Sequence, residues 1–359
     1  MNVAKGQGSA AKSALRVNAW SQGGLSQGSG LSSSASPKDS ADTVLSQDQV
    51  EHVSRPHGLE SLHNKGLTGK GVTVAVIDSG ISPHQDFGDR IKAFRDFTSG
   101  RTVPRKEIDR TGHGTHVAGI IAGSGESVKG IAPEAELVGC RISTPEQAVK
   151  AIDWVIAYKE MYEIDILNLS LGVKAPLNPA DDHFRLAAER TVDAGILVVA
   201  AAGNECQGEV CDSTITSPGN SPKVITVGAL DDRANREPGD DGIYASSSNG
   251  SVTGGKPDLV AEGVKVLAPL AKGSDFAKRL SGSGLYAALS GSSQAAPMVA
   301  GALALMRQVD PNLSQDKAKE LLTKTARKLE DARPEAQGAG RLDLSRAVAA
   351  ARRVAKRKE

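Results

Sequence analysis

The chain is poor in aromatic residues and in cysteine, and neither sign of charge predominates. Phe, Trp and Tyr make up 3% of its 359 residues, and its three cysteines are too few for a small fold held together by disulfides. No apolar run approaches the roughly 18 residues of a membrane-spanning helix. The 43 Lys and Arg residues balance 42 Asp and Glu residues, which argues against a general attraction for nucleic acid. We therefore expect neither a membrane nor a nucleic-acid partner.

Small aliphatic residues and glycine are abundant instead. Hydrophobic residues account for 39% of the chain, and 39 residues are glycine. A core of Val, Ile, Leu and Ala with glycine-rich connections is typical of a tightly wound α/β sheet. The length allows one large α/β domain or two small ones.

The first 56 residues differ in composition from the rest. Residues 21–40 consist largely of Ser, Gly and Gln, so we expect residues 1–56 to form a flexible extension, either a removable cover over the functional site or a passive tail. A basic tail is expected over residues 351–359. The N-terminus lacks the apolar stretch of a secretory signal, which predicts a cytoplasmic protein and leaves export by another route open.

Five apolar, largely β-branched runs predict buried strands of a parallel sheet. They cover residues 72–77, 136–138, 164–169, 196–201 and 223–227. Helical patterns alternate with them over residues 114–122, 145–161 and 183–194, and further helices are predicted over 294–309, 314–329 and 345–356. This alternation implies a doubly wound α/β fold, in which ligands bind at the carboxyl ends of the strands.

Three short motifs carry the residue types of nucleophilic acyl transfer. Asp78 ends the first predicted strand in VIDSG, His113 begins an apolar helix in GHGTHVAG, and Ser293 begins a small-residue helix in LSGSSQAAP. Taken singly, such an aspartate often caps a turn and such a serine often caps a helix. An acid, an imidazole and a hydroxyl at the ligand-facing edge of one sheet are what a serine nucleophile requires.

With a fourth motif, AAGNE at residues 201–205, the chain resembles the subtilisin-like serine protease family (subtilases, peptidase S8). The order Asp, His, Ser is that of the family, and the resemblance extends over residues 57–350. It implies a subtilisin-like, mostly parallel sheet with helices on both faces, and serine endopeptidase activity. We expect polypeptide substrates, a monomer, and no cofactor for the chemical step.

The chemistry and the resemblance together assign the roles. Ser293 is expected to attack the scissile carbonyl and form an acyl-enzyme, His113 to accept and return the proton, and Asp78 to orient the imidazole. The Asn204 amide and the Ser293 backbone N–H are expected to hold the oxyanion.

The resemblance also places two backbone segments beside the substrate. Residues 139–142, beginning at Gly139, and the segment Ser170, Leu171 and Gly172 are expected to bind an extended peptide between them. Glu205 is expected at the rim of the pocket for the side chain before the cut. A carboxylate there would favour Lys or Arg; the alternative is an acidic loop without influence on the substrate.

Some positions depart from the family pattern. Ser292 replaces a threonine before the nucleophile and keeps a hydroxyl there, Gln294 replaces an oxidation-prone methionine, and Glu262 stands where proline is usual. Residues 119–133 lack the asparagine-bearing insertion that contributes to a calcium site in some relatives. Asp86 could match another ligand of that site, but we expect it to be a solvated turn residue. A structural Ca²⁺ ion is therefore left open, without support from the sequence.

Other assignments compete with a serine protease. His113 and His116 could share a zinc ion, but the glutamate of an H-E-x-x-H zinc protease is missing. The aspartates at 231, 232, 240 and 241 either bind Ca²⁺ or are solvated loop charge. The serious alternative is a pseudoprotease that holds an extended peptide without cutting it, and the presence of all four catalytic residue types stands against it.

Two cysteines flank a short loop directly after Asn204. Cys206 and Cys211 either form a disulfide or stay free, and because no signal peptide is visible we expect the reduced state. Cys140 is expected to be a buried packing residue.

Overall fold

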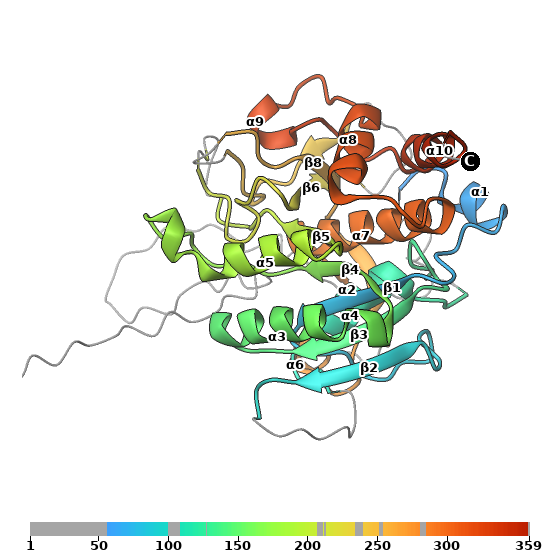
Figure 1. Ribbon diagram of the computed structural model, residues 1–359, viewed down its shortest axis with the longest axis vertical. Helices are drawn as coiled ribbons and strands as arrows, with labels where there is room; N and C mark the ends of the chain where they lie inside the picture. Colours follow the sequence, from blue (N-terminus) through green and yellow to red (C-terminus); the bar gives the residue numbers. More distant parts are fainter. Residues whose placement is uncertain are drawn as a thin grey trace, which may run out of the picture.

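A central sheet with helices on both sides forms the body of the molecule (Figure 1). The computed structural model describes residues 56–99, 108–126, 128–206, 211, 213–233, 240–250, 254–280 and 285–357. The predicted N-terminal extension lies outside the described residues up to position 55, so its flexibility stays a prediction.

The central sheet has the strand order β2-β3-β1-β4-β5-β6-β7, with β8 paired to β6. Its strands are β1 (Thr73–Asp78), β2 (Ile91–Asp96), β3 (Glu136–Arg141), β4 (Ile164–Leu169), β5 (Leu197–Ala201), β6 (Ile225–Asp231), β7 (Gly242–Ile243) and β8 (Leu259–Glu262). Neighbouring strands in it are parallel, except that β7 is antiparallel to β6. A separate antiparallel pair consists of β9 (Val266–Pro269) and β10 (Tyr286–Leu289).

Each face of the sheet is covered by its own set of helices, with a hydrophobic core beneath each set. One core contains side chains of α2 (His113–Ala122), α7 (Ser292–Val309), α8 (Gln315–Thr325) and α10 (Leu344–Ala355). The other contains side chains of α3 (Pro145–Ala157) and α5 (His183–Asp193). The shorter helices are α1 (Leu59–His63), α4 (Lys159–Tyr162), α6 (Asp275–Arg279) and α9 (Pro334–Gln337).

The predicted doubly wound α/β fold is confirmed, and the five predicted strands are β1, β3, β4, β5 and β6. The helix predicted over residues 145–161 is divided at Tyr158 into α3 and α4, and the helix predicted over 314–329 already ends at Thr325. The helix predicted over 345–356 is confirmed as α10, so residues 351–355 of the predicted basic tail are helical. Strand β2 was not predicted, because each of its residues is half-buried at the sheet edge and the run lacks continuous apolar character.

A buried ion pair accounts for the unusual glutamate at position 262. Glu262 ends β8 and is fully buried, and its Oε1 accepts hydrogen bonds from Arg341 Nη2 at 2.8 Å and Nε at 3.2 Å. Arg341 also donates to Asp241. Burial alone would lower the pKa of Arg341, but the two carboxylates hold it above its usual value.

This ion pair is adjacent in sequence to a residue that contacts the start of α7. The residue after Glu262 is Gly263, whose carbonyl accepts a hydrogen bond from the backbone N–H of Gly291 at 2.7 Å. Gly291 is the N-cap of α7. The pair therefore anchors the strand end on which the start of α7 rests.

Replacing Arg341 with methionine would leave Glu262 charged and unpaired in the core. Breaking a buried pair from one side costs about 3–5 kcal/mol, so we expect Arg341→Met to lower the free energy of unfolding by that amount in urea. The double variant with Glu262→Met should recover part of the loss. Lys324→Met, which breaks an exposed pair on α8, serves as a control and should be nearly neutral. An Arg341→Met loss no larger than this control would contradict a stabilising role for the pair.

Candidate active site

Polar residues gather where three parallel strands end. Asp78 is the last residue of β1, Ser170 directly follows β4, and Asn204 lies three residues beyond β5. Because β1 pairs with β4 and β4 with β5 in parallel, these carboxyl ends lie side by side. This is the edge at which the sequence predicts a ligand.

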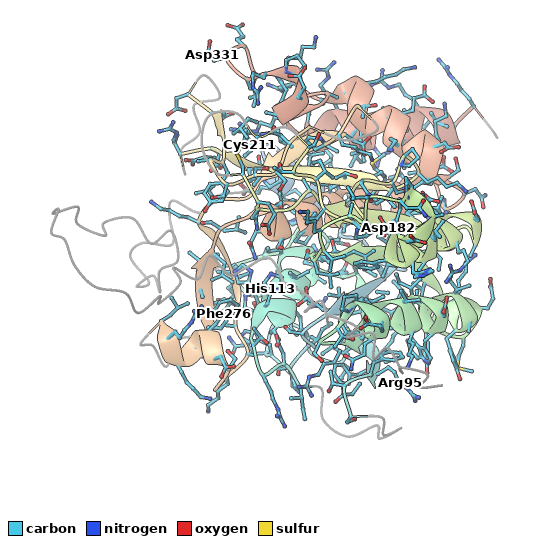
Figure 2. All side chains as sticks on the ribbon, turned by 90° about the vertical axis from the view of Figure 1, so that its left-hand side faces the viewer. Arg95, His113, Asp182, Cys211, Phe276 and Asp331 are labelled. Carbon is cyan, nitrogen blue, oxygen red and sulfur yellow. A yellow bond between two sulfur atoms is a disulfide. The ribbon has the colours of Figure 1, made fainter. Side chains whose placement is uncertain are left out.

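His113 reaches this edge as the first residue of α2 (Figure 2). Its Nδ1 lies 2.8 Å from Asp78 Oδ1, and both side chains are fully buried. The backbone N–H of Ser79 donates to the same carboxylate oxygen at 2.6 Å. Because the carboxylate accepts at Nδ1, the neutral imidazole carries its proton there and Nε2 is its basic nitrogen.

Ser293 is the second residue of α7, which packs against α2, β4 and β5. Its hydroxyl donates to the backbone carbonyl of Ser170 at 2.9 Å, so the helix start is joined to the end of β4. The N–H groups of the first turn and the positive end of the helix dipole lie beside this hydroxyl.

Asn204 is fixed against the same helix start. Its Oδ1 accepts the backbone N–H of Ser292 at 2.9 Å, and the Ser292 hydroxyl contacts both the N–H and the carbonyl of Gly203, at 3.1 and 3.0 Å. A Cβ on Gly291, which has φ 145°, would lie 2.8 Å from Asn204 Nδ2, so glycine is needed there. The hydroxyl that Ser292 keeps thus ties β5 to α7.

The predicted substrate segment after β4 lies next to Ser293. Ser170 contacts it directly, Leu171 is buried in the core under α3 and α5, and Gly172 faces Thr216. A Cβ on Gly172 would lie 2.2 Å from Thr216 Oγ1, so the threonine occupies the space beside this segment. Glu205 is exposed directly after Asn204, and its influence on substrate choice stays a prediction.

Gly139 is not brought together with these residues. It lies within β3, paired with Val76 of β1 on one side and Phe94 of β2 on the other. A Cβ there would lie 2.8 Å from the Phe94 ring. Because both of its edges are occupied by strands, we leave Gly139 out of the candidate site.

The structure gives His116 a structural role. Its Nε2 lies 3.0 Å from the carbonyl of Val266 and 2.9 Å from that of Ala287, so this nitrogen donates a hydrogen bond. Burial lowers the pKa of His116 to about 3. Among the described residues, no three His, Cys, Asp or Glu side chains form a group that could hold a metal ion. The zinc alternative therefore has no structural support in that part of the chain.

Cys206 and Cys211 form a disulfide, so the expectation of reduced thiols is wrong. Their Cα atoms are 5.2 Å apart, which is within the range that a disulfide spans. That expectation rested on the composition of the N-terminus, which says nothing about the distance between the two cysteines. Cys140 is buried, as predicted, and burial raises the pKa of its thiol.

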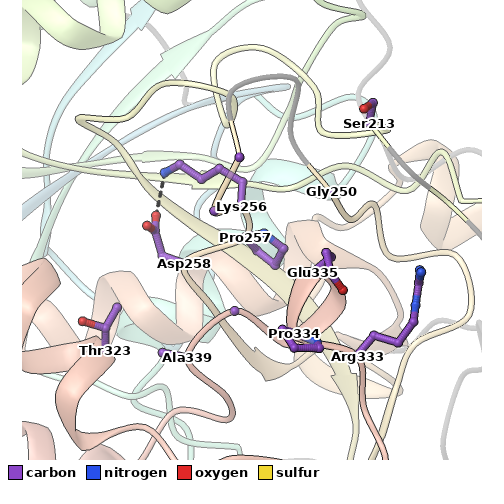
Figure 3. Close-up of a pocket in the computed structure, with 13 residues that line it drawn as sticks. Ser213, Gly250, Lys256, Pro257, Asp258, Thr323, Arg333, Pro334, Glu335 and Ala339 are labelled. Atoms are coloured by element: carbon purple, nitrogen blue, oxygen red, sulfur yellow. Dashed lines mark hydrogen bonds and ion pairs between the residues drawn. The ribbon is translucent and has the colours of Figure 1, made fainter.

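A separate hollow lies at the amino end of β8 (Figure 3). Lys256 in its wall is itself buried, and its Nζ donates to Asp258 Oδ2 at 2.6 Å and to the Val224 carbonyl at 2.7 Å. Burial lowers the pKa of Lys256. Because the ligand-facing edge is at the carboxyl ends of the strands, this hollow is distinct from the candidate site.

One polar residue at the site, Asp109, was not predicted from the sequence motifs. It lies four residues before His113, is buried, and accepts hydrogen bonds from Gly112, Thr115 and Ser79. An acidic residue just before a helix start is a capping signal that could have drawn attention to it.

These features place the chain among serine hydrolases built on a doubly wound sheet. Residues 69–340 match the model of the subtilase family, peptidase S8. The chain is 39% identical over 313 residues to the serine protease AprX of Bacillus subtilis (strain 168), a match that covers 81% of this chain and 70% of AprX. It is 35% identical over 271 residues to Subtilisin Savinase of Lederbergia lenta, covering 74% of this chain and 87% of the relative. The chain belongs to the subtilase family and is a subtilisin-like serine protease.

Two solved structures share the fold. A cold-adapted subtilisin-like serine proteinase matches with a TM-score of 0.58 and 28% identity over 77% of this chain and 88% of its own. Fervidolysin from Fervidobacterium pennivorans, a keratinolytic enzyme related to subtilisin, matches with a TM-score of 0.65 and 22% identity over 84% of this chain. The chain spans 45% of the fervidolysin chain. Among the described residues, no helix is long and apolar enough to cross a membrane.

Proposed function

We propose that this chain is a serine endopeptidase that cuts extended polypeptide segments through Asp78, His113 and Ser293 by way of an acyl-enzyme. The observation that carries the proposal is the 2.8 Å hydrogen bond between the buried His113 and Asp78 side chains, at the sheet edge where α7 presents Ser293. All of these residues belong to one chain, so a monomer suffices. The reaction involves neither nucleic acid nor a membrane.

In acylation, Ser293 Oγ attacks the scissile carbonyl carbon while its proton passes to His113 Nε2. The proton on Nδ1 stays hydrogen-bonded to Asp78, which stabilises the imidazolium. The imidazolium then gives its proton to the leaving amine as the C–N bond breaks, and an ester to Ser293 is left. Water loses a proton to His113, attacks this ester and regenerates the serine.

The negative charge that forms on the carbonyl oxygen requires donors fixed in advance. The Asn204 amide group is suited to this. Its Oδ1 accepts the Ser292 N–H, which fixes the orientation of the amide, and its Nδ2 group is the donor to the oxyanion. The backbone N–H of Ser293 in the first turn of α7 supplies a second donor, supported by the helix dipole.

The substrate is an extended segment beside Ser170, Leu171 and Gly172. Backbone hydrogen bonds to this segment give affinity without regard to sequence, so unfolded chains and flexible loops are the substrate class. Thr216 beside Gly172 limits the space for the side chain before the cut. The exposed Glu205 carboxylate adds a modest preference for Lys or Arg that salt weakens.

The chemical step needs no metal or organic cofactor, and the surroundings of Asp86 do not fit the structural Ca²⁺ ion that the sequence left open. Asp86 is buried, so its expected place in a solvated turn is wrong. Its Oδ1 accepts the Tyr286 hydroxyl at 2.8 Å and lies 3.3 Å from His84 Nδ1. Its Oδ2 has no hydrogen-bond partner among the described residues, but one oxygen falls far short of the roughly six to eight that Ca²⁺ takes.

A guanidinium group already binds the carbonyl oxygens near Asp86. Arg90 donates to the carbonyls of Ala122 at 2.7 Å and Ala135 at 3.0 Å, and also to the carbonyl of Asp86 itself. These contacts join the end of α2 to the segment before β3. Arg90 thus supplies the positive charge that this region needs, without a bound ion.

Removing the nucleophile or the base should abolish hydrolysis. Ser293→Ala and His113→Ala should each remove nearly all activity on a denatured protein, and the double variant should be little worse, because the residues act as a unit. The control is His183→Ala at the exposed start of α5, which should retain full activity. Losses that add in the double variant would mean that the two residues do not cooperate.

Asn204→Ala should lower kcat by about 10²–10³-fold and leave KM nearly unchanged, the effect of removing one oxyanion donor from subtilisin. The physical reason is that the donor binds charge that exists in the transition state and not in the bound substrate. Steady-state kinetics on one peptide separates the two constants, with Asn178→Ala in the exposed turn before α5 as the control. A change confined to KM would instead place Asn204 in ground-state binding.

Chelation should leave the melting temperature unchanged if Arg90 supplies the charge near Asp86. Arg90→Met should lower the free energy of unfolding by about 3 kcal/mol, because a charged donor to buried carbonyls is lost. Arg190→Met, which breaks an exposed pair with Asp153, is the matched control. A chelator-induced drop in melting temperature that Ca²⁺ reverses would contradict the proposal.

A further inference from the structure

Behind the Asp78–His113 pair lies a third ionisable group, Asp109, which has no part in the proton transfers described above. We propose that Asp109 is the positioning residue that sets the distance and angle between Asp78 and His113. The inference rests on the proposed peptidase function, because it concerns the geometry of that catalytic pair.

Four hydrogen bonds converge on the Asp109 carboxylate, two on each oxygen. Oδ1 accepts from the Gly112 N–H and the Ser79 hydroxyl, both at 2.8 Å. Oδ2 accepts from the N–H and the hydroxyl of Thr115, also at 2.8 Å. The residue is 4% exposed, so water does not substitute for these donors.

The donors come from both elements that carry the catalytic pair. Gly112 and Thr115 flank His113 at the start of α2, whereas Ser79 follows Asp78 at the end of β1. The Ser79 backbone N–H also donates to Asp78 Oδ1 at 2.6 Å. One carboxylate therefore holds the turn behind Asp78 and the helix turn that bears His113.

The turn after β1 and the start of α2 approach so closely that a small shift of either would change the distance between Asp78 and His113. A Cβ on Gly114 would lie 2.0 Å from the Gly80 carbonyl oxygen and 3.0 Å from Asp78 Cβ. The Gly114 N–H donates to the Ser79 hydroxyl at 3.0 Å. The contact between β1 and α2 thus consists of backbone, hydroxyl and carboxylate groups, with Asp109 as the shared acceptor.

The two hydroxyl groups that contact Asp109 can only donate to it. Ser79 Oγ accepts the Gly114 N–H and Thr115 Oγ1 accepts the Ser82 N–H at 3.0 Å, so each hydroxyl has its single proton left for Asp109. Two backbone N–H groups and two hydroxyl protons match the four acceptor positions of a carboxylate. An asparagine would turn an N–H₂ group toward one of these pairs of donors.

The loop that carries Asp109 is held independently of its side chain. The Asp109 N–H donates to Ser82 Oγ at 2.9 Å, and the carbonyls of Arg110 and Thr111 accept the N–H groups of Asp275 and Phe276 at 2.8 and 3.1 Å. Loss of the carboxylate should therefore disturb the orientation of the His113 turn more than the path of the chain.

Burial raises the pKa of Asp109 above its ordinary value, although the hydrogen bonds act in the opposite direction. A raised pKa in the folded state means that the group favours folding at low pH and that this contribution is lost as the pH rises through the folded-state pKa. This linkage concerns only the pH dependence of folding; at neutral pH the four hydrogen bonds fix the orientation of the carboxylate between the two elements.

The test is Asp109→Asn in the full chain, with kcat expressed per active site titrated with a fluorophosphonate, so that unfolded protein does not count. We expect kcat to fall by about 10- to 100-fold and KM to stay within about twofold, the size of effect that a small misplacement of catalytic groups produces. The downfield proton NMR signal of His113 Nδ1–H, which reports the hydrogen bond to Asp78, should shift or broaden.

Two further variants keep the result interpretable. Asp343→Asn removes a buried carboxylate that caps α10, and it should change neither kcat nor the His113 signal. Ser79→Ala leaves Asp109 in place and removes one of its donors, so it should produce a smaller change in the same direction. The proposal is overturned if kcat and the signal of Asp109→Asn match the unmodified chain, or if Asp343→Asn changes them equally. Because the NMR signal does not depend on turnover, it tests the positioning role even if the chain fails to cut peptides.

Discussion

The parallel pairing of β1, β4 and β5 determines where the polar residues of the candidate site meet. Strands that run in the same direction present their carboxyl ends at one edge, and there Asp78, Ser170 and Asn204 meet. The two remaining groups arrive on helices that begin at this edge, α2 with His113 and α7 with Ser293. Residues far apart in the sequence therefore come together, and positive-φ glycines, Gly112 and Gly291, are the N-caps of the two helices.

The burial of α7 holds the candidate site rigidly in place. Helix α7 is buried from Ser292 to Met306, so its start cannot move without disturbing the core. Its first turn is tied to Gly203 through Ser292, to β4 through Ser293, and to Gly263 through Gly291. In such a water-poor setting, hydrogen bonds between polar side chains are strong and unpaired groups are costly. The site is therefore held mainly by hydrogen bonds between elements.

The sequence predicted what depends on local pattern and motif. Runs such as residues 164–169 indicate a strand because a strand buried on both faces must be apolar throughout, and β4 has those bounds. Asp78, His113, Asn204 and Ser293 could be predicted as site residues because each lies in a short motif. The role of Asp109 was not predicted, because it depends on Ser79 and Thr115, which the fold alone brings together. The Glu262–Arg341 pair was missed for the same reason, since its members are 79 residues apart.

If Ser293 is an activated nucleophile, it should react with a fluorophosphonate. The full native chain is treated with the probe and digested, and the modified residue is identified by mass spectrometry. We expect one adduct on Ser293, absent from Ser293→Ala and formed much more slowly in His113→Ala, because the imidazole must accept the serine proton. A folded native chain that binds an extended peptide and takes up no probe would instead be a peptide-binding pseudoprotease, and Ser293 would not be an activated nucleophile.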